Sequence, residues 1–144
     1  MSGNANAIKK RVKEWSVHAE EDLRLARHAF KLKSAVPYKL IAYHAQQCAE
    51  KRLKAYLVYN KIYFPYTHNI SLLIEMLPPS AEWSNSLWNA GILSSYAVTA
   101  RYPGKGRVTK KEAIRAVSIA DTVRKTVIKA LLQEGLKILP RAKS

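Results

Sequence analysis

The sequence predicts an all-α protein, an antiparallel four-helix bundle with one additional short helix, and three observations lead to that prediction. Long segments carry apolar residues at spacings of three and four, the pattern of amphipathic helices. Only five glycines and six prolines interrupt the 144 residues. Hydrophobic residues make up 48% of the chain, which is ample for one packed core. We therefore expect a single domain over residues 1–144, with its core in about 7–134 and a frayed basic C-terminal tail.

The first two helices are expected over residues 7–32 and 37–60 and should form a hairpin. In the first, apolar residues from Ile8 to Phe30 recur on one face. The second begins at Pro37, which suits the first turn of a helix. The link between the two segments is short, and short links join antiparallel neighbours.

A short helix is expected from Ile70 to Leu77, after an aromatic connector over residues 61–69. Thr67 or Asn69 can cap its first turn, because their side chains accept hydrogen bonds from unpaired backbone amides. The pair of prolines that follows should end this helix.

Two further long helices complete the predicted bundle. One is expected over residues 81–101, with Ser80 as its cap. The other is expected over residues 110–134 and opens on the sequence TKKE, residues 109–112, which has the spacing of a capping box. Gly135 should end this last helix.

The chain is strongly basic. It carries 25 Lys and Arg against 10 Asp and Glu, a net charge of +15, with a pI near 10.1. Such a field attracts polyanions, which include RNA, DNA, a nucleotide phosphate or an acidic protein. The alternative is that the basic helix faces only keep the protein soluble. We expect an anionic partner.

Several features favour a cytoplasmic protein with no membrane segment. No stretch approaches the roughly 18 apolar residues that a membrane span needs. The first residues lack the apolar segment of a secretory signal. Cys48 is the single cysteine, so no internal disulfide can form, and we expect its thiol to be buried or half-buried in a helix.

Asp22 is the first candidate site residue, because it falls at the edge of the apolar stripe of the first helix. A buried carboxylate is costly unless it is paired. Its candidate partners are Lys51, Arg52 and Arg101. The pair would form either a polar site inside the bundle or an ion pair that holds helices in register.

A second candidate lies in the sequence YHAQQCAEKRLKAYL, residues 43–57. His44 and Lys51 are seven residues apart and share one helix face, whereas Gln46 and Glu50 lie on an adjacent face. Glu50 can also pair with the residue four positions later, Lys54. These groups would line a cleft, or alternatively would form a solvated flank with local salt bridges.

The third candidate is the basic segment that precedes the last helix. Backbone amides at a helix N-terminus attract anions, and basic side chains beside them strengthen the effect. The segment lacks the Walker sequence of phosphate-binding loops. Its candidate anion-binding residues are Arg101, Tyr102, Lys105 and Arg107.

Catalytic patterns are mostly missing from the sequence. The four histidines are scattered, none has the spacing of a zinc site, and no Gly-x-Ser-x-Gly sequence is present. With few carboxylates, a two-metal site is not expected either. We predict neither a catalytic residue nor a metal or other cofactor, and favour a binding protein over a self-sufficient enzyme.

Four sequence features, in this order, resemble the HEPN family, the domains named for higher eukaryotes and prokaryotes nucleotide-binding. They cover about residues 10–130. The features are Trp15-x3-Ala19-x2-Asp22-Leu23, Ala45-Gln46-Gln47-x2-Glu50-Lys51-x-Leu53-Lys54-Ala55, Thr67-His68-x-Ile70-x-Leu72-Leu73 and Ala100-Arg101-Tyr102-Pro103.

This resemblance implies a bundle of four main helices, a homodimer, and a partner that is a minimal nucleotidyltransferase, in a toxin–antitoxin-like pair. The transferase would perform the chemistry, and this chain would hold a nucleotide or other anionic ligand. The expected cleft residues are then Asp22, Gln46, Glu50 and Lys51. Candidates for the dimer interface, with a buried core role as the alternative, are Tyr63, Phe64, Trp83 and Trp88.

Two alternatives remain open. Other HEPN branches are metal-independent RNases with an Arg-x4–6-His motif. No histidine follows Arg101 or Arg107, whereas Arg11 and His18 match the spacing in the first helix, where those RNases do not carry the motif. The other alternative is a nonspecific nucleic-acid-binding protein, whose affinity would fall steeply with salt.

Overall fold

The computed structural model describes residues 2–99 and 106–136. Three of the predicted anion-binding residues, Arg101, Tyr102 and Lys105, lie outside these ranges. Across the described residues the secondary structure is entirely helical, which confirms the predicted fold class. The elements are α1 (Ser2–Ala29), α2 (Tyr38–Tyr59), α3 (Ile70–Glu75), the 3-10 helix η1 (Glu82–Leu93), α4 (Ser94–Thr99) and α5 (Lys110–Gln133).

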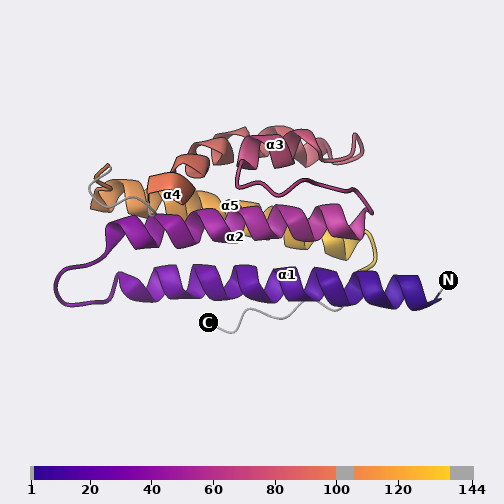
Figure 1. The fold of residues 1–144 in the computed structure, drawn as a ribbon, viewed down its shortest axis with the longest axis horizontal. Helices are drawn as coiled ribbons and strands as arrows, with labels where there is room; N and C mark the ends of the chain where they lie inside the picture. The colour runs from indigo at the N-terminus through magenta and orange to yellow at the C-terminus, as the bar shows by residue number, and fades with distance from the viewer. Residues whose placement is uncertain (1, 100–105, 137–144) are drawn as a thin grey trace.

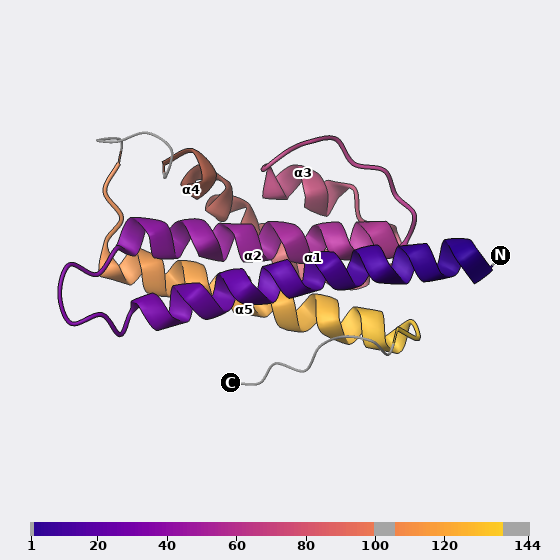
Figure 2. The ribbon, with the colours of Figure 1, turned by 60° about the horizontal axis from the view of Figure 1, so that its bottom comes forward.

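The long segments alternate in direction along the chain. α1 and α2 form the predicted antiparallel hairpin, η1 and α4 run back across α2, and α5 returns in the direction of α2 (Figure 1). Turning the molecule shows that α1 and α5 both lie beside α2 (Figure 2). α2 is therefore the central helix, and it is buried on nearly every side from Ala45 to Val58.

The core is built from leucines of the three long helices and from small residues on α2. Leu23, Leu53 and Leu131 come from α1, α2 and α5, and none of them is exposed. Burying one such side chain stabilises the fold by about 1.5–3 kcal/mol. Ala45 and Ala49 on α2 are also fully buried, and their small side chains let neighbouring helices approach closely.

The predicted N-terminal caps of α3 and α5 are confirmed, whereas α3 ends at Glu75, two residues before the predicted Leu77. Asn69 accepts a hydrogen bond from the Leu72 amide at 3.1 Å and so caps α3. Thr109 and Glu112 form both bonds of the capping box at the start of α5, at 3.1 and 2.9 Å. Gly135 follows α5 with a φ of 98°, a left-handed conformation that glycine adopts without strain.

The fourth predicted helix is only partly an α-helix, and Ser80 does not cap it. Residues Glu82–Leu93 form a 3-10 helix, and the α-helix starts only at Ser94. The N-cap of η1 is Ala81, whose side chain makes no capping bond. Serine, asparagine and glycine are frequent in η1, and they favour the α-helix weakly because they compete for backbone hydrogen bonds or cost backbone entropy.

The four aromatic residues considered for an interface divide into two pairs. Phe64 and Trp83 are half-buried and pack against the core, where Trp83 lies edge-on to Tyr56 with ring centroids 4.9 Å apart. Tyr63 and Trp88 are exposed, by 87% and 49%.

Among the described helices, none has both the length and the apolar character required to cross a bilayer.

Candidate functional site

Asp22 joins α1 to two residues of α2. Lys51 Nζ lies 2.6 Å from Asp22 Oδ2, and His44 Nδ1 lies 2.9 Å from Asp22 Oδ1. The Asp22 carboxylate is only 11% exposed, so its two partners replace most of the water it would otherwise bind. His44 and Lys51 do share one face of α2, as their spacing predicts.

The second candidate partner of Asp22, Arg52, binds a different carboxylate. Arg52 Nη2 donates to Glu20 Oε1 at 2.6 Å, and Arg124 Nε donates to the same oxygen at 2.7 Å. Burial raises the pKa of Glu20, but the hydrogen bond and charge of Arg124, together with those of Arg52, outweigh burial and lower it. Glu20 thus links α1, α2 and α5.

Sequence reasoning missed Glu20, although a signal for it was present. Glu20 lies four residues after Ser16 and three before Leu23, both of which are fully buried. The edge argument that singled out Asp22 therefore applies equally to Glu20, on the opposite edge of the same stripe. Two carboxylates flank the buried face of α1, and each meets a cation of α2.

Glu50 is the centre of the second polar cluster. Gln46 Nε2 and His68 Nδ1 both lie 2.8 Å from Glu50 Oε1, and Lys54 Nζ lies 2.9 Å from Oε2. The predicted pair of Glu50 and Lys54 is confirmed. The alternative of a solvated flank is wrong, because the two side chains are only 4% and 5% exposed.

Lys54 and His68 reach Glu50 from different surroundings. The Lys54 ammonium lies 5.4 Å from the centre of the Trp15 ring and 5.5 Å from that of Phe64, so two aromatic rings also stabilise its charge. His68 comes from the connector between α2 and α3, and its Nε2 lies 3.3 Å from the Tyr66 hydroxyl. Two of the scattered histidines, His44 and His68, thus lie against buried carboxylates.

The structure therefore divides the predicted cleft residues into two clusters. Asp22 with Lys51 forms one, and Gln46 with Glu50 forms the other. Arg107 is exposed just before α5 and belongs to neither. Within residues 2–99 and 106–136, no three His, Cys, Asp or Glu side chains converge in a way that could hold a metal ion.

A pocket of about 490 Å³ opens beside Lys51, between α1 and α2. Its volume lies within the range of small-molecule sites, roughly 300–1,000 Å³. The Arg11 and His18 side chains, which match the Arg-x6-His spacing, both reach this pocket. It is lined by Arg11, Glu14, Trp15, His18 and Lys51.

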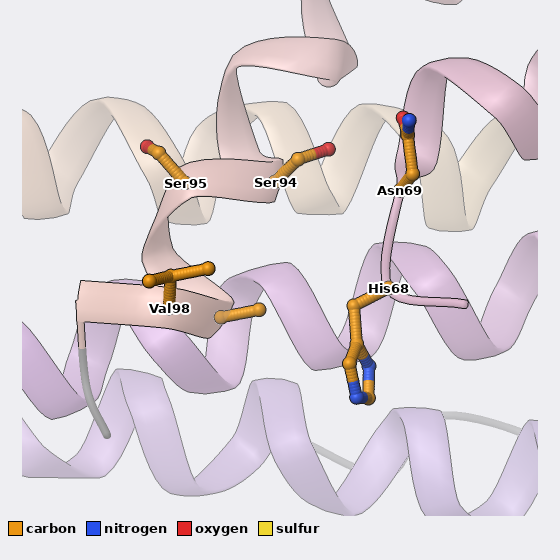
Figure 3. Close-up of a pocket in the computed structure, with 6 residues that line it drawn as sticks. His68, Asn69, Ser94, Ser95 and Val98 are labelled. Atoms are coloured by element: carbon orange, nitrogen blue, oxygen red, sulfur yellow. The ribbon is translucent and has the colours of Figure 1, made fainter. Parts of the chain in front are cut away.

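A second pocket, of about 340 Å³, lies between α4 and the start of α3. In Figure 3, Ser94, Ser95 and Val98 form one wall, and His68 and Asn69 form the opposite wall. The Ser94 hydroxyl accepts a hydrogen bond from the Ile70 amide at 2.9 Å and so joins these walls. This pocket adjoins the Glu50 cluster through His68.

Helices packed around a central α2, with polar clusters buried along that helix, define a helical-bundle domain whose interior is held by ion pairs. Comparison with known families identifies it further: the chain belongs to the HEPN family, because the model of the HEPN domain matches residues 12–134. The resemblance found in the sequence is thereby confirmed.

Two solved structures are similar to this chain. The crystal structure of TT1696 from Thermus thermophilus superposes with a TM-score of 0.73 and 26% sequence identity, over 83% of this chain and 97% of that one. The crystal structure of ST0689, an archaeal HEPN homologue, superposes with a TM-score of 0.63 and 27% sequence identity, again over 83% of this chain and 97% of that one. Comparison with curated protein sequences finds no significant match.

Proposed function

We propose that this HEPN chain is a binding subunit, which holds a nucleotide or another anionic ligand and partners a minimal nucleotidyltransferase in a toxin–antitoxin-like pair. The observation that carries the proposal is the way charge is distributed. Asp22, Glu20 and Glu50 are each held by basic side chains of the same chain. Each internal pair cancels one positive and one negative charge, so the excess of +15 stays uncompensated within the chain and supports an anionic partner.

Because the buried carboxylates are paired within the chain, the charged groups that stay available at the surface are mainly basic. A carboxylate that accepts two or three bonds at 2.6–2.9 Å has little capacity left for a ligand. The side chains that remain able to bind are mainly Lys and Arg, which attract phosphate groups. This supports a protein that holds an anion and leaves bond-making to a partner.

Ligand binding is tested by a thermal-shift screen with nucleoside mono-, di- and triphosphates at constant ionic strength. A ligand at a hundred times its dissociation constant stabilises the folded state by about 2.7 kcal/mol. We expect at least one nucleotide to raise the melting temperature, and sodium sulfate at the same ionic strength to have a smaller effect. No shift with any nucleotide would count against the binding function.

The partner is tested separately. We expect the reading frame beside this gene to encode a minimal nucleotidyltransferase, and the two proteins, expressed together, to elute as one complex from a size-exclusion column. Light scattering of this chain alone tests the homodimer. A neighbouring transferase that always elutes apart from this chain would contradict the proposed partnership.

RNA cleavage is a second candidate function, favoured by one observation. Arg11 and His18 lie in the walls of the same pocket, so the matching spacing in the sequence corresponds to a shared site. The assay is cleavage of RNA in EDTA, with His18→Ala as the variant. Cleavage that survives this substitution would exclude His18 as the responsible residue.

A further inference from the structure

One end of the bundle carries most of the excess positive charge of the described residues. The last turns of α1 and the first turns of α2 and α5 meet there, around a small core to which all three helices contribute (Figures 1 and 2). We call residues 24–41 and 106–117 the basic end. They contain nine Lys and Arg and a single carboxylate, Glu112, whereas the other described residues contain eleven Lys and Arg against nine Asp and Glu. The charge is therefore concentrated where it can attract an anionic surface.

Most of these cations are not neutralised by the fold. Arg27 pairs with Asp121 at 2.9 Å, and the Glu112 carboxylate accepts a hydrogen bond from the Thr109 amide at 2.9 Å. The exposed cations of the basic end that make no ion pair with a described residue are Arg24, Lys31, Lys33, Arg107, Lys110, Lys111 and Arg115. A surface rich in carboxylates can meet these cations without displacing an internal partner.

Exposed aliphatic side chains stand among these cations. They are Leu25, Leu32, Leu40 and Ile114, and each is about half exposed. Covering such side chains removes apolar surface from water and so favours association, by about 25 cal/mol for each Å² buried. Apolar side chains surrounded by charged ones are typical of surfaces that bind another protein. The basic end therefore offers apolar contacts as well as charge.

A nucleic acid suits this surface less well than a protein does. Single-stranded nucleic acids bind largely by stacking their bases on aromatic side chains. Phe30 and Tyr38 of the basic end are half-buried, pack against the small core and lie with ring centroids 6.3 Å apart. The exposed aromatic residues that the structure describes lie elsewhere, at Tyr63, Tyr66 and Trp88. Aliphatic side chains among cations instead complement a helix that carries leucine-like residues on one face and carboxylates beside them.

We propose that the basic end binds an acidic amphipathic helix of a partner protein. Carboxylates of that helix pair with exposed cations such as Lys31 and Lys111, and its apolar face covers aliphatic side chains such as Leu32 and Ile114. The inference goes beyond the proposed function, because it requires no nucleotide and assigns both the surface and the chemistry of a protein partner.

The test is fluorescence anisotropy of the full-length protein with three labelled probes at an ionic strength of about 0.15 M. The first probe is a synthetic peptide of about 20 residues, with leucines at spacings of three and four and mainly glutamates elsewhere. The second has the same composition, but its leucines are scattered over all faces. The third is a single-stranded RNA of the same charge. We expect the amphipathic peptide to bind at least about tenfold more tightly than either of the others.

Two matched pairs of variants on α5 locate the surface. Lys111→Glu reverses a charge of the basic end, and Lys129→Glu reverses an exposed charge about 27 Å further along the helix. This separation is about three Debye lengths, so Lys111→Glu should weaken peptide binding about tenfold and Lys129→Glu less than about threefold. Ile114→Ser should weaken binding about fivefold. Its control, Leu132→Ser, changes a side chain of the other end that is 52% exposed, against 51% for Ile114, and should have less than about a twofold effect. Circular dichroism checks that each variant is folded.

The other outcomes overturn the proposal in different ways. If both peptides bind equally well, charge alone drives association and the aliphatic side chains have no role. If Lys111→Glu behaves like Lys129→Glu, the surface lies elsewhere. Tighter binding of the RNA, with a loss in Lys111→Glu, would make the basic end a nucleic-acid surface. If the amphipathic peptide does not bind the wild-type protein, the inference fails, whereas the proposed nucleotide-binding function is unaffected.

Discussion

Arg52 of α2 donates to Glu20 of α1 at 2.6 Å, while its guanidinium is almost completely buried, with 1% of the side chain exposed. Arg52 Nε and Nη1 make no hydrogen bond with the described residues. Glu20 is therefore the carboxylate that neutralises a cation at the interface of the long helices. A buried cation is tolerated only when it is paired, so this contact has consequences for stability.

Replacing Glu20 should destabilise the fold. We expect Glu20→Gln to lower the free energy of unfolding by roughly 2–4 kcal/mol, because Arg52 would remain buried without a counter-charge. Urea unfolding followed by circular dichroism measures the change. Glu21→Gln is the matched control, since the Glu21 side chain is 71% exposed and its loss should cost less than about 0.5 kcal/mol. Equal stability of the two variants would contradict the proposed role of Glu20.

The same contact should make stability depend on acidity. The pKa of Glu20 is lower in the folded state, so the unfolded state takes up the proton more readily. The contribution of Glu20 is complete above the unfolded pKa, about 4.3, and is lost as the pH falls through the folded pKa. The difference in unfolding free energy between the wild-type protein and Glu20→Gln should therefore narrow from pH 6 to pH 3. If the unfolding free energies of the two proteins differ by the same amount from pH 6 to pH 3, Glu20 is not the source of the acid dependence.

The pair of Glu50 and Lys54 should show strong coupling. Glu50→Gln leaves the buried Lys54 ammonium without a counter-charge and should cost roughly 3–5 kcal/mol. Adding Lys54→Met removes the stranded charge and should restore a large part of the loss. Urea unfolding of the two single variants and the double variant measures this coupling. Losses that simply add would mean that the two side chains act independently.

Cys48 should be inert in the folded protein. Burial raises the pKa of its thiol to about 12, so almost no thiolate exists at neutral pH. We expect a maleimide reagent to label Cys48 at pH 7 only as urea unfolds the chain. Labelling of the native protein within minutes would show that the thiol is accessible.

Gly91 should tolerate a side chain only if Ser71 moves. A Cβ atom at Gly91 would lie 2.2 Å from the Ser71 hydroxyl oxygen, where η1 crosses α3. Because the Ser71 hydroxyl can rotate away and its Cβ would lie at an ordinary 3.6 Å, Gly91→Ala should cost less than about 1 kcal/mol, and adding Ser71→Ala should recover what is lost. Thermal unfolding of the single and double variants checks this. If the double variant is no more stable than Gly91→Ala, the close approach is not the cause.

Several elements of the site followed from spacing alone. The seven-residue interval placed His44 and Lys51 on one face of α2, and the four-residue interval paired Glu50 with Lys54. Which cation would meet Asp22 could not be predicted. Lys51 and Arg52 are adjacent in sequence and point about 100° apart on a helix, so the choice depends on how α2 is rotated against α1.

Contacts between residues far apart in the sequence could not be predicted, for the same reason. His68 meets Glu50 across 18 residues, and Arg124 meets Glu20 across 104. Such contacts depend on how whole helices and connectors pack, which no local pattern encodes. The 3-10 geometry of η1 was also missed, because apolar spacing indicates a helical face without fixing the turn that produces it.

The sequence by itself determined the all-α class, the hairpin of the first two helices, the caps of α3 and α5, the family and the excess of positive charge. These properties depend on periodicity, composition and contacts within a few residues. The tertiary structure decided which carboxylate meets which cation, and that Arg11, Trp15 and Lys51 share a pocket. The rotation of each helix about its axis governs both, and that rotation is set by the packing of the entire core.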